Sequence, residues 1–320
     1  LEPACGTGNF FGCLPETMTA SRLYGVELDS LSARIARQLY PKAHITAAGF
    51  ETTDRRDFYD LAVGNVPFGQ YQVNDPAYNK LGFSIHNYFL AKALDQLRPG
   101  GILACVTSRY TMDSKDPAAR QYLAQRAKLL GAIRLPNTAF KANAGTDVVS
   151  DILFLQKVES PIQDDPAWVQ TAEDEHGYPV NRYFLDHPEM VLGRPGSEST
   201  RYGYDYTVNP IPGEELPEQL RAALRHIHGE YRTAVSTELE EETAGAIPAD
   251  PAVKNYSYTI VDGKVYYREN SVMVRPALNA AARERVCGLV RLRDCVHCLI
   301  DLQLDDRTPD SAIREKQAEL

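Results

Sequence analysis

The feature that most constrains the fold lies in the first eight residues, Leu-Glu-Pro-Ala-Cys-Gly-Thr-Gly, where an apolar and acidic start runs into a glycine-rich turn. Glycine adopts positive φ angles without strain, and its missing Cβ lets the backbone lie against a ligand. A turn of this composition between a strand and a helix is typical of α/β folds that hold a nucleotide-like cofactor there. Taken alone, the pattern also fits a purely structural tight turn, so the rest of the chain must decide.

Beyond this turn, apolar runs of strand length alternate with stretches of helical periodicity over roughly the first half of the chain. In residues 30–39, for example, Leu31, Ile35 and Leu39 fall on one helix face. This alternation predicts an α/β fold with a doubly wound, mostly parallel sheet that is covered on both faces. The expected strands are the opening residues of the chain, 22–29, 44–47, 60–64, 102–107, 131–135 and 147–157, and the expected helices are 10–19, 30–39, 84–97 and 118–130.

The second half of the chain has a different composition, rich in proline, glycine and acidic residues at first and helical later. We expect an amphipathic helix over 214–235, an acidic linker over 236–251, and a β-hairpin near 255–273 that turns at Asp262-Gly263. The predicted organisation is a domain over 1–158, an irregular arm over 159–210, and a mainly helical extension with the hairpin over 211–320.

Composition excludes several classes of protein. The chain has 320 residues, 43% of them hydrophobic and 24% charged, as in soluble globular proteins. No apolar run reaches the length of a membrane span, and no signal peptide is present, so we expect no membrane partner. Six cysteines without a disulfide spacing indicate a reducing cytoplasm. A net charge of -9 is unfavourable for nucleic-acid binding, which would need a local basic patch or another domain.

Features near both ends of the chain lead to further expectations. Cys295 and Cys298 have the spacing of half a zinc site, but no second pair lies nearby, and we expect packing cysteines and no metal. Arg291 and Arg293 fit a solvated helix face, with DNA contact as the alternative. The chain begins without Met inside an expected strand and ends inside an expected helix, which predicts a piece of a larger protein.

Glu27 ends the second expected strand, about twenty residues after the glycine turn. In doubly wound folds an acid at this place accepts hydrogen bonds from the ribose hydroxyls of a cofactor. A solvated acid at a strand end is the structural alternative. The spacing from the glycine turn favours the binding role.

The segment Asn65-Val66-Pro67-Phe68 follows the fourth expected strand, at the edge where ligands of open α/β sheets lie. The Asn65 amide oxygen and the backbone carbonyl of the next residue can accept both hydrogens of an amino group, which leaves the nitrogen lone pair aimed at an electrophile. Phe68 offers a flat apolar face to a ring. An Asn turn beside a packed aromatic ring is the structural alternative.

Together these residues resemble the adenine-N6 DNA methyltransferases, which use S-adenosylmethionine. Residues 1–8 are similar to the cofactor motif of that family, 25–29 to its ribose motif, and 65–68 to its Asn-Pro-Pro-Tyr/Phe tetrapeptide. Residues 97–102 and 140–156 resemble later parts of the same domain, so the resemblance covers roughly the first half of the chain. Residues 140–147 and the arm after them also resemble large methylase-helicase proteins of bacterial mobile elements.

The resemblance implies a class I, Rossmann-like methyltransferase with a seven-stranded sheet, S-adenosylmethionine as cofactor, and DNA as partner through regions outside this stretch. It implies direct methyl transfer to the N6 amino group of a flipped-out adenine, within a restriction-modification or mobile-element protein with further domains. The implied cofactor-binding residues are Glu2, Pro3, Ala4, Cys5, Gly6, Gly8, Asn9, Phe10, Glu27, Leu28, Gly49, Phe50 and Asn65, and the implied catalytic residues are Asn65, Val66, Pro67 and Phe68.

Two positions depart from the family pattern. Val66 replaces the first proline of the tetrapeptide but keeps the carbonyl that the family uses. Gly49 stands where many relatives have an acid that binds the adenine amino group, which leaves Phe50 to pack on that ring and Glu51 to substitute for the acid. Two alternatives therefore stay open: an RNA or protein-glutamine methyltransferase, and a catalytically degenerate cofactor-binding module of a larger DNA-processing protein.

Overall fold

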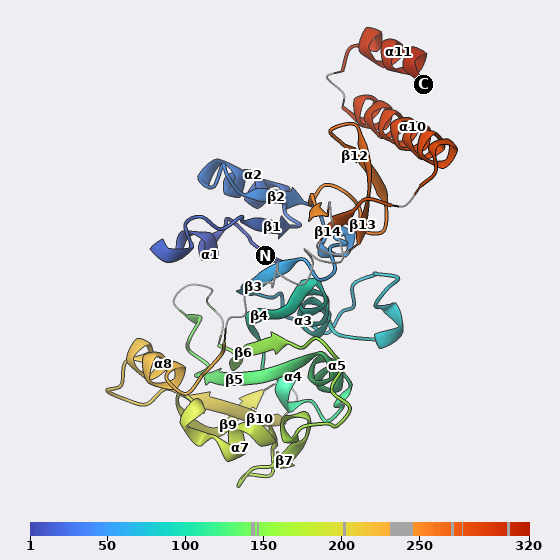
Figure 1. Cartoon of the computed structure of the whole chain (residues 1–320). Coiled ribbons are helices and arrows are strands. Elements are labelled where there is room, and N and C mark those ends of the chain that lie inside the picture. Colours follow the sequence, from blue (N-terminus) through green and yellow to red (C-terminus); the bar gives the residue numbers. More distant parts are fainter. Residues whose placement is uncertain are drawn as a thin grey trace. The chain divides into compact units, whose positions relative to one another are not determined.

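The computed structural model describes residues 1–141, 145, 147–200, 203–230, 246–269, 272–276, 278–305 and 308–320. Within it the chain forms two compact units, 1–234 and 235–320 (Figure 1). Parts of the expected acidic linker and of the expected helix over 214–235 lie outside the described residues.

The first unit contains a mixed sheet built around the first two residues. β1 (Tyr24–Glu27) pairs with β2 (His44–Ala47), and β3 (Tyr59–Asn65) with β4 (Leu97–Ser108), both in parallel. Leu1 and Glu2 join these pairs: the Leu1 amine donates to the Leu61 carbonyl at 2.7 Å, and the Glu2 N–H donates to the Tyr24 carbonyl at 2.8 Å. Glu2 thus bridges β1, and Leu1 bridges β3.

The far side of the sheet ends in two antiparallel pairings. β6 (Ser150–Lys157) lies between β4 and β5 (Ala127–Leu135) and runs against both. The order across the sheet is therefore β2, β1, residues 1–2, β3, β4, β6 and β5. This arrangement confirms the predicted α/β, Rossmann-like, mostly parallel fold.

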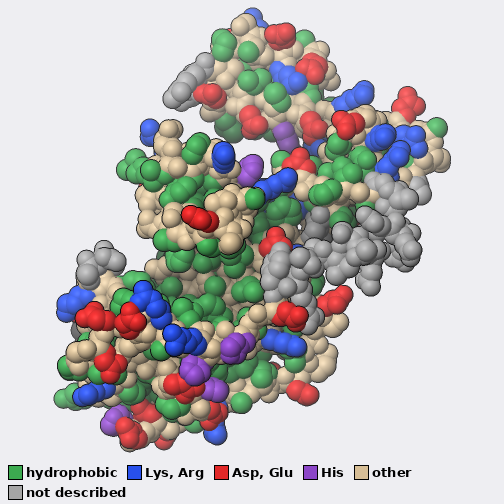
Figure 2. Space-filling view, turned by 60° about the vertical axis from the view of Figure 1, so that its left-hand side comes forward, with side chains coloured by type: hydrophobic (Ala, Val, Ile, Leu, Met, Phe, Trp, Pro, Cys, Tyr) green, Lys and Arg blue, Asp and Glu red, His purple; other side chains and the backbone are tan. Residues whose placement is uncertain are grey.

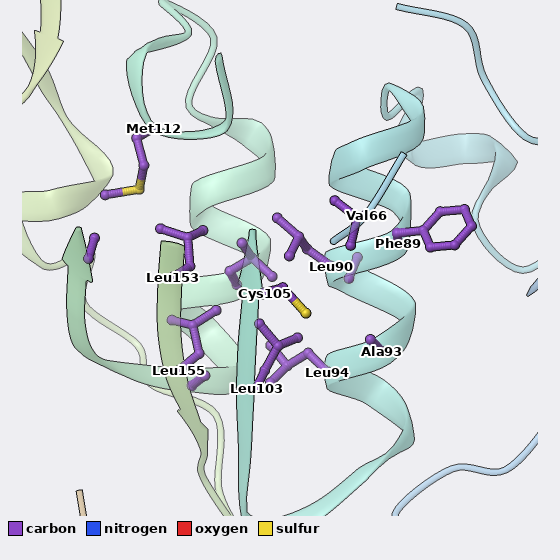
Figure 3. Packing of buried hydrophobic residues seen from close by; sticks show 14 of the residues in the cluster. Val66, Phe89, Leu90, Ala93, Leu94, Leu103, Cys105, Met112, Leu153 and Leu155 are labelled. Atoms are coloured by element: carbon purple, nitrogen blue, oxygen red, sulfur yellow. The ribbon is translucent and has the colours of Figure 1, made fainter. Parts of the chain in front are cut away.

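Helices pack against this sheet and bury its core. α3 (Ile85–Gln96) and α5 (Ala118–Arg126) lie on one face, where Leu90 and Leu94 meet Leu103 and Cys105 of β4 (Figure 3). Short α1 (Asn9–Gly12) follows the glycine turn, and α4 (Tyr110–Asp113) follows β4. α1 is shorter than the helix expected over 10–19, because Pro15 interrupts it and only the single 3-10 turn Glu16–Met18 follows.

Helix α2 (Ser30–Leu39) has the predicted bounds but buries a different face. Leu31, Ile35 and Leu39 share one face as expected, and that face is exposed. Ala33 and Ala36 are the buried residues instead. Small side chains let the helix backbone approach β1 and β2 closely, which the apolar periodicity alone does not reveal.

The described residues of 159–210 do not form the separate irregular arm that we predicted. They form β7 (Thr171–Glu173) and β8 (Pro179–Asn181), α7 (Arg182–Asp186), and the hairpin of β9 (Arg194–Thr200) and β10 (Gly203–Asn209). Buried side chains of this stretch join the same hydrophobic core as the sheet, so it belongs to the first unit. Its strands are short and interrupted by proline and glycine, which gives them a loop-like composition. The core residues are Trp168, Val169, Val180, Phe184, Met190, Leu192, Tyr206 and Val208.

The second unit holds the expected hairpin and helices. β12 (Tyr258–Val261) and β13 (Lys264–Glu269) pair across Asp262 and Gly263, both at positive φ, and β14 (Val272–Val274) and β11 (Ile247–Pro248) extend the sheet. α10 (Ala280–Leu304) and α11 (Asp310–Glu319) follow, while α8 (Leu216–Leu224) belongs to the first unit. Cys295 is buried in α10 and Cys298 is exposed. Among the described residues, no helix is long and apolar enough to cross a membrane.

Candidate cofactor and acceptor site

The glycine turn after residue 2 adopts backbone angles that favour glycine. Gly6 and Gly8 have φ angles of +54° and +88°. A Cβ on Gly8 would lie 2.6 Å from the Tyr40 ring, whereas a Cβ on Gly6 would meet nothing within 4 Å. Gly8 is therefore needed both for its φ angle and for packing, and Gly6 leaves open space beside the turn.

Glu27 is brought directly onto this turn. Its carboxylate accepts the Gly6 N–H at 2.7 Å through Oε2 and the Asp29 N–H at 2.8 Å through Oε1. Asp29 in turn caps α2 by accepting the Ser32 N–H, and Leu28 is exposed beside it. The two motifs that the sequence linked only by spacing are thus joined by a hydrogen bond.

Glu2 is a buried carboxyl group behind the turn, 2% exposed. Burial raises its pKa to about 8, against the opposing effects of the Leu1 amine and the Phe10 N–H. Among the described residues, Oε2 of Glu2 has no hydrogen-bond partner. Such a group is suited to a ligand that brings positive charge or a donor.

The remaining residues of the cofactor motif line the same stretch of chain. Pro3 and Cys5 are buried, Ala4 and Phe10 are half-buried, and Asn9 is exposed. The Cys5 N–H donates to the Val26 carbonyl at 2.9 Å, so the turn begins directly against β1.

The segment 65–68 begins at the last residue of β3 and leaves the sheet beside β4. Asn65 pairs with Val106 at the end of β3, and the Val66 N–H donates to the Val106 carbonyl at 3.1 Å. Val66 is 2% exposed and packs with Leu90 in the core (Figure 3). Asn65 is exposed, and no described residue hydrogen-bonds its side chain. Pro67 and Phe68 are half-buried, and Phe68 packs against the core.

Phe50 lies in the core of the first unit. Its ring, 2% exposed, packs on Phe89 at 5.0 Å between centroids, and the Lys92 ammonium lies 5.4 Å from its centre. The Lys92 Nζ also donates to the Glu51 carbonyl at 3.1 Å. Contact between Phe50 and an adenine ring stays a prediction, as does a binding role for Gly49.

A cavity of about 280 Å³ lies beside α1, and Phe10, one of the predicted cofactor-binding residues, is part of its lining. Its lining includes Leu23 and Tyr24 at the start of β1 and Tyr59 and Leu61 at the start of β3. Ligands of this fold lie beyond the carboxyl ends of the strands, so this cavity at their amino ends is not the predicted cofactor site.

A network of charged residues near the carboxyl end of β4 was not found from the sequence. Buried Arg134 of β5 is bidentate to Asp151 of β6, with both distances 2.8 Å, and pairs with Asp113 at 2.8 Å. Arg109, directly after β4, pairs with Asp205 of the β9–β10 hairpin at 2.6 Å. These partners are up to 96 positions apart in the chain, and no local pattern marks them.

Comparison with known proteins gives partial matches, and no protein-family model matches the chain. Defense against restriction protein B of Escherichia phage P1 is 32% identical over 167 residues, which are 49% of this chain and 7% of that protein. Type II methyltransferase M.CvrRI of Paramecium bursaria Chlorella virus XZ-6E is 34% identical over 119 residues, 36% of this chain and 31% of that protein. The chain thus spans less than a third of the length of either relative.

Solved structures give weaker likenesses. A protein described as a class I S-adenosylmethionine-dependent methyltransferase of Listeria monocytogenes matches with a TM-score of 0.43 and 22% identity, over 51% of this chain and 54% of that one. A modification subunit described as part of a type I restriction enzyme of Vibrio vulnificus matches with a TM-score of 0.42 and 17% identity, over 56% and 53%. At these TM-scores, the function proposed below does not rest on either structure.

Proposed function

We propose that this chain is an S-adenosylmethionine-dependent methyltransferase module that methylates the N6 amino group of adenine in DNA. One observation carries the proposal. The Glu27 carboxylate holds the glycine turn by the Gly6 N–H at 2.7 Å, while two strands away Asn65 ends β3 with its amide unengaged by any described residue. Both groups lie at the edge of the sheet where ligands of this fold bind, which supports a cofactor at the turn and an acceptor amine at Asn65.

The cofactor is S-adenosylmethionine, and the residues of the turn fit it. Glu27 would accept the ribose hydroxyls, and the open space beside Gly6 lets the backbone approach the ligand. Glu2 adds a buried carboxyl with an unpartnered oxygen, which suits a cofactor with positive charge. Bound there, S-adenosylmethionine supplies a methyl group on a sulfonium centre.

The chain's own residues would act on the acceptor amine. The Asn65 amide oxygen and the Val66 carbonyl would each accept one amine hydrogen, which orients the nitrogen lone pair and stabilises the charge that develops on nitrogen. Phe68 would hold the base by stacking. Val66 anchors this segment through its N–H and its buried side chain, so the backbone that carries both acceptors has a fixed starting point.

DNA is the acceptor that the relatives favour. One is named a type II methyltransferase, and the other a phage protein for defence against restriction. Acidic and basic side chains are interspersed over the described residues on the face that Figure 2 shows, and the net charge is -9. We therefore propose that much of the DNA affinity comes from further domains of the same parent chain. A cytoplasmic location and a mobile-element origin belong to the same proposal.

The test is a transfer assay with tritiated S-adenosylmethionine and three acceptors in parallel: unmethylated DNA, total RNA and a protein extract. Label in DNA, recovered as N6-methyladenine, is the expected result. Asn65→Ala should keep cofactor binding and lose about 3 kcal/mol of transition-state stabilisation, roughly a hundredfold in rate. Gln38→Ala, which removes an exposed amide on α2, is the matched control and should transfer normally.

Each other outcome has a definite meaning. Unimpaired transfer by Asn65→Ala would remove the role assigned to that side chain. Label in RNA or protein, lost in Asn65→Ala, would move the function to another acceptor. Cofactor binding without transfer to any of the three would favour a degenerate binding module.

A further inference from the structure

Tyr110 is an exposed aromatic residue directly beyond the carboxyl end of β4. Its side chain is 43% exposed, although its hydroxyl donates to Asp205 Oδ2 at 2.9 Å. The Arg109 guanidinium lies 4.3 Å from the centre of the ring. The ring is thus held at its hydroxyl and at the guanidinium, and part of it is open to solvent.

The partners of Tyr110 are themselves fixed. Buried Arg109 contacts both carboxylate oxygens of Asp205 at 2.6 Å and Asp113 at 3.4 Å. Asp205 also accepts its neighbour's N–H, from Tyr206 at 2.8 Å, and Tyr206 is buried in the core. Charge-assisted hydrogen bonds of this kind are about twice as strong as neutral ones. The ring orientation is therefore set before any ligand arrives.

This ring lies on the acceptor side of the proposed site. β3 and β4 are parallel neighbours, and Asn65 pairs with Val106, so the segments 65–69 and 108–110 leave the same edge of the sheet. Residues just after both segments are hydrogen-bonded to the first turn of α3. Asn87 accepts the Thr111 hydroxyl at 3.0 Å, and the Ile85 N–H donates to the Tyr71 carbonyl at 2.9 Å.

We infer that Tyr110 is a stacking platform for a nucleobase of the acceptor strand, with Arg109 and Asp205 as its positioning residues; this rests on the proposed function. A preoriented ring loses little conformational entropy when a base stacks on it. Stacking also depends little on charge, which matters for a chain of net charge -9 that repels phosphates. The β9–β10 hairpin, which contributes Asp205, thereby becomes part of acceptor binding.

The test measures binding of the 320-residue chain to oligodeoxyadenylate of about 16 nucleotides and to an abasic phosphodiester of equal length. Wild type should prefer the strand with bases. Tyr110→Leu should bind oligodeoxyadenylate about tenfold more weakly and the abasic strand unchanged. Tyr110→Phe keeps the ring and should bind like wild type. S-adenosylmethionine affinity, measured in each variant, should be unchanged and reports on folding.

Three results would overturn the inference. The first is equal binding of the two strands by wild type, and the second is a Tyr110→Phe variant that binds oligodeoxyadenylate as weakly as Tyr110→Leu. The third is an equal loss of oligodeoxyadenylate affinity in Tyr204→Leu, which removes an exposed tyrosine of the hairpin. The second result would assign Tyr110 only to docking the hairpin through its hydroxyl. If Asn65-dependent methylation persists while base preference is absent, only this inference fails. If base preference is present without methyl transfer, only the proposed function fails.

Discussion

Replacing Glu27 with Gln tests the link between the glycine turn and the ribose motif. Gln keeps the length of the side chain but turns one acceptor oxygen into an NH2 donor, which must then face either the Gly6 N–H or the Asp29 N–H. A hydrogen bond to a charged group contributes about 1.5–3 kcal/mol. Because the same carboxylate would accept the ribose hydroxyls, we expect S-adenosylmethionine to bind roughly 10- to 100-fold more weakly.

Calorimetric titration with S-adenosylmethionine, beside urea unfolding of the free protein, separates the two roles of this carboxylate. An analogue without ribose hydroxyls should bind wild type and Glu27→Gln with similar affinity. Glu159→Gln, on an exposed side chain with no predicted role in binding, should change neither measurement. If Glu27→Gln lowers the free energy of unfolding but binds S-adenosylmethionine as tightly as wild type, Glu27 only stabilises the turn. The proposed hydrogen bonds from the ribose hydroxyls to its carboxylate are then refuted.

Two further variants test buried charge. The pKa of Glu2 is raised from 4.5 to about 8, so its contribution to stability is fully present below pH 4.5 and is lost as the pH rises through 8, at up to about 1.4 kcal/mol per pH unit. Glu2→Gln is neutral at every pH and should therefore raise the urea midpoint relative to wild type above pH 8 but not below pH 4.5. A difference between the two proteins that does not change with pH would contradict this. Arg134→Met leaves buried Asp151 without a cation and Asp113 with only the longer contact to Arg109, and it should cost about 3–5 kcal/mol in urea unfolding. Lys141→Met, in an exposed pair with Asp147, should cost under about 1 kcal/mol. Similar small losses in both variants would show that the buried network contributes no more than a surface pair.

The cofactor half of the site could be predicted from the sequence because its signals are local. Glycines at positive φ, and an acid at the end of the next strand, are dictated by backbone geometry within about thirty residues. Glu27, which the sequence relates to the turn only by spacing, accepts a hydrogen bond from the Gly6 N–H at 2.7 Å in the structure. The mostly parallel α/β sheet could also be predicted, because alternating strands and helices with crossover connections leave few topologies.

The network of Arg109, Arg134 and Asp205 could not be predicted in the same way, because long-range ion pairs assemble it. Arg109, Arg134 and Asp205 stand in different parts of the chain, and nothing in the sequence around each of them distinguishes it from an ordinary charged residue on the surface. Burial of a charge depends on a partner that only the folded chain supplies. The same reason explains why the stretch 159–210 was predicted to be an arm: its role in the core depends on contacts with β5 and α4, not on its own periodicity.

Val66 illustrates how a departure from a sequence pattern can keep a loop fixed. A proline at this position would set φ but has no N–H. Val66 uses its N–H to continue the β3–β4 ladder to Val106 at 3.1 Å, and its side chain is almost wholly buried against α3. A ladder hydrogen bond and a buried β-branched side chain both restrict the backbone, so the segment after Asn65 has a fixed starting point without the ring. The substitution therefore changes how the acceptor loop is held and leaves both predicted acceptors, the Asn65 amide and the Val66 carbonyl, available for an amine.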